Sequence, residues 1–355
     1  MDIKLDKFLI NNDSKTFFIA DIAANHDGDL GRALELINLA KDSGANAAKF
    51  QHFSAETIVS PKGFEKLGSK IAHQTNWDKS VYEVYQEASV PPDWTNVLFT
   101  ECEKIGIEFM STPYSFSAVD LLDPYVNAFK IGSGDINWIE EIELIASKRK
   151  PIFLATGASE LNEVREAVDV IQKHGVPLCL MQCNTNYSGQ FSNFNYINLN
   201  VLKQYKKLFP NVILGLSDHT EGHTTVLGAI ALGAKVVEKH FTDDKNRKGP
   251  DHKFSMSPKG WKEMVDRSLE LQLSLGSGLK KIEMNEEESV LVQRRSLRAK
   301  GNLSKGKIIT RDDLTILRPA PLNSISPNKI NEVLGKKLNK DVGNDENLYW
   351  GDIEI

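Results

Sequence analysis

Two histidines of this sequence directly follow short apolar runs, at positions where a metal could be held. His219 and His240 each follow such a run, and the two runs are consecutive in the chain. Neutral imidazoles that leave coordination positions open for water and substrate suit a catalytic Mn²⁺, Zn²⁺ or Fe²⁺. A lone histidine at a strand end is more often a hydrogen-bonded structural residue, but a pair on neighbouring strands favours a metal site.

Three lysines occupy similar positions: Lys49, Lys130 and Lys239. With the hydroxyl groups near them they would form a ring of cations and hydrogen-bond donors. Such a ring suits a small phosphorylated anion, because charge-assisted hydrogen bonds to phosphate and carboxylate are the strong ones. Any one of these lysines could instead neutralise Asp218 or Glu238, but we do not expect all three to do so.

The elements that must position these residues are strands and helices in alternation. Eight apolar runs have strand length and are continuous rather than alternating, as expected when helices cover a parallel sheet. Eight β/α units in about 280 residues predict a (β/α)8 TIM barrel. A doubly wound sheet is the alternative, but it would carry fewer strands and a Gly-rich first turn. The runs are Phe17–Ala23, Ala45–Phe50, Ile107–Ser111, Ala128–Ile131, Ile152–Ala155, Leu178–Cys183, Val212–Leu216 and Lys235–Glu238.

Polar residues end every one of these runs. A barrel of this kind builds its active site at the carboxyl ends of its strands, and unpaired polar groups there would each cost a few kcal/mol. Packing therefore does not explain them, and we expect one site. The polar strand-end residues are Asp21, Asn25, His26, Lys49, Gln51, Ser111, Thr112, Lys130, Ser133, Thr156, Gln182, Tyr187, Ser217, Asp218, His219, Glu238, Lys239 and His240.

The remaining histidines and cysteines are weaker candidates. Three histidines are expected to bind substrate or phosphate rather than metal, three others to lie on the surface or in loops, and two cysteines to be small core residues without a metal role. Asp251, in a turn-forming Gly-Pro-Asp-His string, is either a carboxylate that reaches the site or a plain turn residue. The histidines expected to bind substrate or phosphate are His26, His223 and His252, and those expected on the surface or in loops are His52, His73 and His174. The two cysteines are Cys179 and Cys183.

Two segments depart from the β/α pattern. The connection from Phe53 to Val90 is too long for a simple loop and is expected to lie over the mouth of the barrel. After the barrel domain, residues 1–278, a linker is expected over 279–290. The pattern then changes to short β-like runs with turns, which predicts a small β-rich domain over 291–355.

Composition narrows the function classes. The chain has 355 residues, 41% hydrophobic and 26% charged, with a net charge of −5. This charge is too mild for a nucleic-acid binder, and the absence of a long apolar run excludes a spanning helix. Three cysteines and no visible signal peptide predict a protein of the reducing cytoplasm, without membrane or nucleic-acid partners.

Several strings resemble the sialic acid synthase family, and they occur in the family's order along nearly the whole chain. The residues after 290 resemble the antifreeze-like (SAF) domain that follows the barrel in these enzymes. The barrel strings are IADIAANHDG (19–28), AKFQ (48–51), STP (111–113), FKIGSG (129–134), ATG (155–157), LSDHT (216–220), EKHF (238–241) and GPDH (249–252); those of the second domain are QRRSL (293–297) and LRP (317–319).

The resemblance implies a reaction and roles for individual residues. The family condenses phosphoenolpyruvate with an N-acylated mannosamine-type sugar, giving a nonulosonic acid and phosphate. It works with a divalent metal, Mn²⁺ first and Mg²⁺ or Co²⁺ as alternatives, in a homodimer with swapped SAF domains. The implied catalytic residues are Asp21, Lys49, Lys130, His219 and His240, with the two histidines as metal ligands; phosphoenolpyruvate would be held by Lys49, Gln51, Ser111, Thr112, Lys130, Ser133, Thr156, Ser217 and Lys239, and the sugar by Asp21, Asn25, Tyr187, Asp251 and Arg318.

Four departures from the family pattern lie near the substrates. Asp21 stands where the family usually has glutamate, Ala155 where serine is common, and Ala23 where glycine is usual. The usual Cys-Thr-x-x-Tyr-Pro string appears as Cys183-Asn-Thr-Asn-Tyr187-Ser. The acceptor sugar therefore stays open among those of the N-acetylneuraminate, legionaminate and pseudaminate synthases.

Two other functions stay open at this point. A Schiff-base pyruvate aldolase would use Lys130 or Lys239 as the nucleophile. In a non-catalytic sugar-binding homologue, Asp21 would be the substitution that removed the activity.

Overall fold

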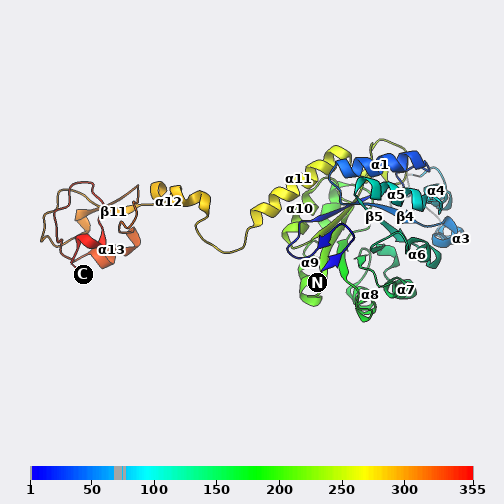
Figure 1. Ribbon diagram of the computed structural model, residues 1–355, viewed down its shortest axis with the longest axis horizontal. Coiled ribbons are helices and arrows are strands. Elements are labelled where there is room, and N and C mark those ends of the chain that lie inside the picture. The colour runs from blue at the N-terminus through cyan, green and yellow to red at the C-terminus, as the bar shows by residue number, and fades with distance from the viewer. Residues whose placement is uncertain (1, 68–73, 75–76, 355) are drawn as a thin grey trace. The chain divides into compact units, whose positions relative to one another are not determined.

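The computed structural model describes residues 2–67, 74 and 77–354. The chain divides into two compact units, residues 1–276 and 277–355, which are described separately (Figure 1). None of the helices in the described ranges is long and apolar enough to cross a membrane.

The first unit is an eight-stranded parallel sheet in the order β5-β4-β3-β10-β9-β8-β7-β6. The two strands at the ends of this order also lie against each other, so the sheet is a nearly closed barrel. All eight predicted strands are present, and their ends differ from the predicted ones by at most two residues. The strands are β3 Phe17–Asp21, β4 Ala47–His52, β5 Glu108–Pro113, β6 Phe129–Ile131, β7 Ile152–Ala155, β8 Leu178–Cys183, β9 Ile213–Asp218 and β10 Val236–His240.

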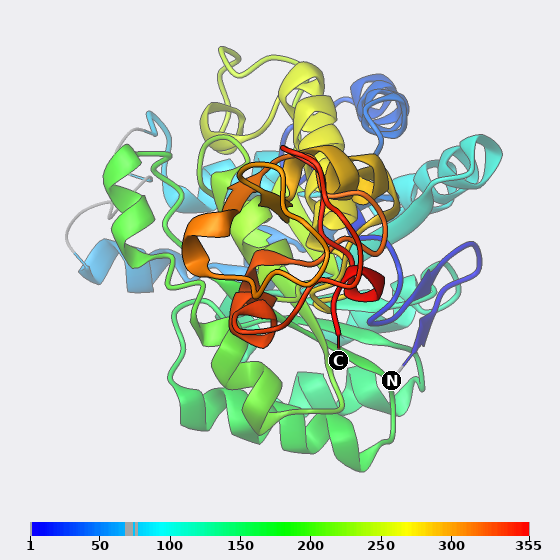
Figure 2. The same ribbon diagram turned by 90° about the vertical axis from the view of Figure 1, so that its left-hand side faces the viewer.

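Helices interleave with the strands and surround them (Figures 1 and 2). Each has an apolar side that packs on the outer face of the sheet in one continuous core. Helix α5 ends where Gly106 adopts a left-handed φ of 72°, a conformation that glycine takes without strain. The helices of the barrel are α1 Leu30–Asp42, α5 Trp94–Ile105, α6 Phe116–Leu122, α7 Ile139–Ser147, α8 Leu161–Lys173, α9 Val201–Leu208, α10 Thr224–Ala231 and α11 Pro258–Leu275.

Side chains along each strand alternate between the barrel interior and the helix layer, because successive Cβ atoms point to opposite faces of a sheet. On β3, Phe17 and Ile19 belong to an inner cluster, whereas Phe18 and Ala20 pack with the helices. A short antiparallel hairpin, β1 Ile3–Lys4 with β2 Leu9–Ile10, adds its own side chains to the inner cluster. The lower half of the barrel is therefore filled mainly with apolar groups.

The described residues of the connection after β4 include the short helices α2 Ala55–Ile58, α3 Pro61–Lys66 and α4 Val81–Ala88. Helix α4 begins with a capping box, in which Ser80 and Glu83 satisfy each other's backbone N–H groups. The long predicted insertion is thus partly helical.

The second unit has a small core of its own. Helix α12, Glu287–Gln293, precedes β11, Ser296–Ala299, which pairs antiparallel with β12, Leu314–Leu317. Between these strands Ile308 forms an isolated bridge with Lys337, so Lys307–Ile309 is not a strand. The core of this unit is made by Leu297, Ala299, Leu303, Ile309, Leu314, Ile325, Val333, Leu338, Val342, Leu348 and Ile353.

Candidate functional site

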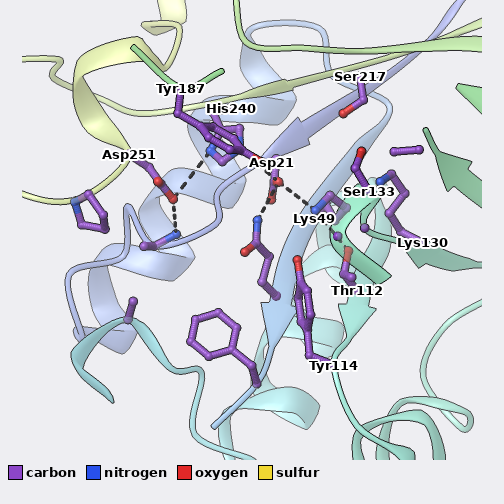
Figure 3. A pocket seen from close by; sticks show the side chains of 18 of the residues that line it. Asp21, Lys49, Thr112, Tyr114, Lys130, Ser133, Tyr187, Ser217, His240 and Asp251 are labelled. Atoms are coloured by element: carbon purple, nitrogen blue, oxygen red, sulfur yellow. Dashed lines mark hydrogen bonds and ion pairs between the residues drawn. The ribbon is translucent and has the colours of Figure 1, made fainter. Parts of the chain in front are cut away.

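A cavity of about 410 Å³ lies at the carboxyl ends of the barrel strands. Its lining includes charged residues at the strand ends, among them Asp21, Lys49 and Lys130 (Figure 3). Side chains of the connection after β4 also line it. The predicted site residues that line it are Asp21, Lys49, Gln51, Thr112, Lys130, Ser133, Tyr187, Ser217, His219, His240 and Asp251.

The alternation along each strand decides which residues reach this cavity. On β10, Glu238 and His240 line it, whereas Lys239 between them does not. On β5, Thr112 lines it and its neighbour Ser111 does not. On these two strands, therefore, only the residues of one face reach the cavity.

Asp21 and Lys49 form the centre of the site. Lys49 Nζ lies 2.7 Å from Asp21 Oδ2, and Gln51 Nε2 donates to the same oxygen over 3.0 Å. Both charged side chains are 2% exposed. Burial alone would lower the pKa of Lys49, but Asp21 and Glu238 outweigh it and the pKa is raised. Lys49 is therefore held as an ammonium group inside the barrel.

Lys130 and its neighbours form a region rich in donors. Lys130 Nζ lies 3.7 Å from Glu238 Oε1 and donates to the carbonyl oxygen of Ile131, the next residue in the chain. Ser133 Oγ accepts from the backbone N–H of Gly157 over 2.9 Å, so its own hydroxyl hydrogen can point into the cavity. Ser217 lines the same cavity (Figure 3). Cationic and hydroxyl donors of this kind can hold a phosphate or a carboxylate.

The two predicted metal ligands face each other, with ring centroids 5.4 Å apart. His219 Nδ1 donates to the carbonyl oxygen of Asn184 over 2.9 Å, which leaves Nε2 as the free ring nitrogen. Burial first, and then His219 and Lys49, hold the pKa of His240 well below its usual range. Its Nδ1 is buried without a hydrogen-bond partner in the described ranges and lies 3.7 Å from Asp251 Oδ2.

This donor set fits a divalent metal in part. Two imidazoles with available nitrogens and a nearby carboxylate are suitable ligands. Among the described residues, no three His, Cys, Asp or Glu side chains converge into a ready-made site. A metal here would be held by two imidazoles, with oxygen atoms of water and substrate to complete its coordination.

Asp251 lies in the cavity, as one of the two interpretations of its loop predicted. Its Oδ2 accepts from the backbone N–H of Ala24 over 3.3 Å. Burial raises the pKa of this carboxyl to about 6. The Gly-Pro-Asp-His string is therefore more than a surface turn.

Lys239 does not belong to the predicted ring of cations. It faces the helix layer, where its Nζ lies 2.6 Å from Asp218 Oδ2 and donates to the carbonyl oxygen of Thr220 over 2.6 Å. Asp218 is its register neighbour on β9. This is the structural ion pair that the sequence left open as the alternative for any one lysine.

Three further predicted ligands also lie outside the cavity lining. Ser111 bonds to a ring nitrogen of His52 over 2.7 Å. Thr156 donates to the Met181 carbonyl oxygen and accepts from a tyrosine hydroxyl. Asn25 donates to the Phe241 carbonyl oxygen and to a serine hydroxyl. These side chains are occupied in supporting the strand ends.

Three histidines have surroundings other than those predicted. His52 is 3% exposed and lies between Ser111 and Thr95, so it is neither a surface nor a loop residue. His26 and His252 are fully buried and do not line the cavity, so they are not positioned to bind substrate there. His73 lies outside the described residues.

Cys183 is closer to the site than predicted. It lines the cavity, and its Sγ lies 4.0 Å from His219 Nδ1. Although burial raises the pKa of this thiol, contacts with His219 outweigh burial and the pKa is lowered. Cys179, four residues earlier on the same face, belongs to the inner apolar cluster as predicted.

Sequence reasoning missed a pair of buried carboxyl groups. Asp135 lines the cavity, and burial raises its pKa to about 6. Burial, with Asp135 as a second cause, raises the pKa of Glu141 to about 8. The position of Asp135, two residues after Ser133 in a strand-end string, was a signal that could have identified it.

The connection after β4 gives the cavity an apolar wall. We use this term for Phe53, Ile58, Val84 and Ala88 of that connection, all of which line the cavity together with Trp77 and Tyr85. The ring of Phe53 lies 5.3 Å from that of Tyr85 and 5.8 Å from that of Tyr114. The prediction that this connection lies over the mouth of the barrel is confirmed.

Arg318 belongs to the second unit, where it is exposed and precedes Pro319. It directly follows β12, in the Leu-Arg-Pro string whose resemblance to the SAF domain is described above.

Comparisons with known proteins match both units. A model of the NeuB family matches residues 36–280, and a model of the SAF domain matches residues 294–354. N,N′-diacetyllegionaminic acid synthase of Campylobacter jejuni is 38% identical, over 94% of this chain and 98% of its own length. Pseudaminic acid synthase of the same species is 33% identical, over 97% and 98%.

A solved structure agrees with these relatives. The N-acetylneuraminic acid synthetase of Leptospira borgpetersenii, in complex with citrate, has a TM-score of 0.71 and 28% sequence identity to this chain. The similarity covers 82% of this chain and 95% of that chain.

Proposed function

Since this chain belongs to the NeuB family and carries a SAF domain, we propose that it condenses phosphoenolpyruvate with an N-acylated mannosamine-type aldose and releases phosphate. The relatives named above are synthases of nonulosonic acids, so this chain is an enzyme of that general kind. The observation that carries the finer proposal is the convergence of Lys49, Lys130 and Asp21 with the pair of imidazoles in one buried cavity.

Phosphoenolpyruvate would lie against the donor-rich region. The ammonium group of Lys130 and the hydroxyl groups of Ser133 and Ser217 are suitable donors to its phosphate and carboxylate. Thr112, whose Oγ1 lies 3.4 Å from Lys49 Nζ, would add a further hydroxyl. Because these groups are fixed before the substrate binds, they can stabilise the charge that develops during the reaction without reorganising.

The aldehyde of the open-chain sugar would lie near Asp21 and the histidines. His219 and His240 would hold a divalent metal, with Mn²⁺ proposed first and Mg²⁺ or Co²⁺ as alternatives. A bound metal supplies Lewis-acid polarisation of the aldehyde oxygen. Asp21 Oδ2, which is 3.6 Å from His240 Nε2, is positioned to hold a water or a sugar hydroxyl at the reacting end.

The bond changes follow from these substrates. The enol carbon of phosphoenolpyruvate forms a C–C bond with the aldehyde carbon, and water adds to the neighbouring carbon. Cleavage of the C–O bond of this tetrahedral species then releases phosphate. The neighbouring cations Lys49 and Lys130 would stabilise the negative charge, and the apolar wall would limit the access of bulk water.

The two alternatives have less support. A Schiff-base aldolase through Lys130 or Lys239 requires an amine that is free to become neutral, whereas Lys239 is bound to Asp218 and Lys130 lies 3.7 Å from the carboxylate of Glu238. A non-catalytic homologue would not need buried charges, which are costly to maintain without a function. Asp21 keeps a carboxylate at this position, one methylene shorter than the usual glutamate.

The SAF domain and the homodimer form the remaining part of the proposal. We propose that Arg318 binds the sugar within a domain-swapped homodimer, as the family resemblance implies. This step rests on the resemblance.

A phosphate-release assay tests the function. The purified full chain would be supplied with phosphoenolpyruvate, Mn²⁺ and a panel of 2-acetamido sugars, with and without a chelator. Metal-dependent phosphate release that requires a sugar supports the synthase. Trapping of a pyruvate adduct by borohydride would instead support the aldolase, and no turnover with any sugar would refute the proposed function.

A further inference from the structure

Two loops at the mouth of the barrel meet at the carboxylate of Asp251. The N–H group of Ala23 donates to Asp21 Oδ1 over 3.1 Å. The next N–H group in the chain, that of Ala24, donates to Asp251 Oδ2 over 3.3 Å. Figure 3 shows both carboxylates among the side chains that line the cavity. The position of Asp251 therefore depends on how the two loops lie against each other. They are residues 22–29, which we call the β3 loop, and residues 241–257, which we call the β10 loop.

The β3 loop has a backbone shape that needs support from outside the loop. Ala23 and Asp27 have φ angles of 47° and 52°, in the left-handed region that residues with a Cβ atom rarely adopt. Such conformations persist where the surrounding structure fixes them. Contacts with other parts of the chain must therefore hold this loop.

His252 supplies such a contact, because its buried ring bonds to one residue of each loop. Its Nε2 lies 2.8 Å from Asp27 Oδ1, and its Nδ1 lies 2.7 Å from Thr242 Oγ1. A carboxylate can only accept, so Nε2 carries a hydrogen and donates it to Asp27. A Cβ atom added at Gly249 would lie 2.6 Å from Cδ2 of this ring, so the backbone of the β10 loop packs directly against the imidazole.

Arg32 adds a second connection between the same loops. Its guanidinium group donates to Asp243 Oδ2 over 2.7 Å and to the carbonyl oxygen of Asn25 over 2.7 Å. This connection remains when His252 is replaced, so the loops should shift rather than unfold. Neither Arg32 nor His252 lines the cavity, whereas Asp251, the chain neighbour of His252, does.

We propose that His252 is a positioning residue, which fixes the carboxylate of Asp251 in the cavity by binding Asp27 of the β3 loop. Its effect on the sugar, to which the family resemblance assigns Asp251, rests on the proposed function. A misplacement of about 1 Å in an active site can cost on the order of a hundredfold in rate. Phosphoenolpyruvate, proposed to lie against the donor-rich region around Lys130, should be affected little.

Steady-state kinetics of the full chain test this role, with phosphoenolpyruvate, Mn²⁺ and the 2-acetamido sugar of the panel that is turned over fastest. His252→Leu removes both hydrogen bonds of the ring and should raise the KM for the sugar tenfold or more, while the KM for phosphoenolpyruvate stays within twofold. His252→Gln keeps a donor toward Asp27 and should keep both KM values within threefold. Val168→Ala, at a buried position of α8, is the control for lost stability and should change neither KM. An equal rise of both KM values in His252→Leu, or no rise in the folded variant, overturns the inference.

Two further variants show whether the effect passes through Asp251. In an Asp251→Asn background, His252→Leu should lower kcat/KM for the sugar by less than threefold, because the group that it positions is already lost. Fully additive effects would overturn the inference. Asp27→Gly keeps the left-handed φ accessible and removes the partner of His252. It should raise the same KM, and it replaces His252→Leu if that variant does not fold.

Hydrogen exchange of the full chain without substrates separates this inference from the proposed function. His252→Leu should accelerate exchange of the Ala24 amide, which donates to Asp251, at least tenfold, and His252→Gln should not. If no sugar is turned over, the proposed function fails, and the exchange rate at Ala24 alone decides the positioning of Asp251. Unchanged exchange in folded His252→Leu overturns it.

Discussion

Replacing Glu141 by glutamine is expected to stabilise this protein at neutral and alkaline pH. Glu141 is 1% exposed in the first turn of α7. Its Oε1 has no hydrogen-bond partner within the part of the chain that the structure describes. Burial, followed by the neighbouring Asp135, raises its pKa from 4.5 to about 8. The native state therefore keeps a proton that the unfolded chain releases.

The sign and size of the effect follow from this difference. Between pH 4.5 and 8 the unfolded state ionises at Glu141 and the native state does not, so the free energy of unfolding falls as the pH rises. The difference in pKa between the two states corresponds to a loss of unfolding free energy of at most roughly 5 kcal/mol. About 2 kcal/mol of it is lost by pH 6. Glutamine does not ionise, so the variant lacks this loss.

Urea denaturation at pH 5, 6, 7 and 8 measures the effect. The difference in unfolding free energy between Glu141→Gln and the unmodified protein should grow with pH. Glu140→Gln is the matched control, because Glu140 is exposed in the same helical turn. A difference for Glu141→Gln that is equal at pH 5 and pH 8 would refute the assignment of a buried, protonated carboxyl.

The other predictions concern the cations and the metal ligands. Lys239→Met leaves Asp218 buried without its cation and should lower the free energy of unfolding by about 3–5 kcal/mol, measured by urea denaturation; a loss below 1 kcal/mol would contradict the ion pair. Lys130→Met should instead raise the KM for phosphoenolpyruvate, and an unchanged KM would count against its proposed role. His240→Ala should abolish Mn²⁺ binding in equilibrium dialysis with an unchanged circular dichroism spectrum, and retained Mn²⁺ affinity would exclude this histidine as a ligand. Arg318→Ala should raise the KM for the sugar more than that for phosphoenolpyruvate, and mixing it with subunits inactivated in the barrel should restore part of the activity; failure to complement would exclude the proposed swap.

The barrel could be predicted because its signals are local. Each strand is a continuous apolar run, and each is followed by an amphipathic segment, so the number and order of the elements could be read along the chain. The hairpin of β1 and β2 could not be predicted in this way. Its strands have two residues each, too few to show a period.

From the sequence, the site could be predicted only as a set of residues at strand ends, and not as the subset that faces the cavity. Lys239 and Ser111 were assigned to the cavity with their neighbours Glu238 and Thr112, although adjacent residues on a strand face opposite sides. Applying that alternation to the sequence would have separated them. The burial of His52 depends on Thr95, 43 residues away, and no local pattern indicates it.

The alternation along the strands has a consequence for how such an enzyme can change its chemistry. Near the carboxyl ends of the strands, one set of positions faces the cavity and the other anchors the helical shell. There, the residues that line the site and those that hold the shell are interleaved but separate. Asp21, in place of the usual glutamate, is a variation of the first set only. Laboratory evolution restricted to that set should therefore alter selectivity with little loss of folded protein.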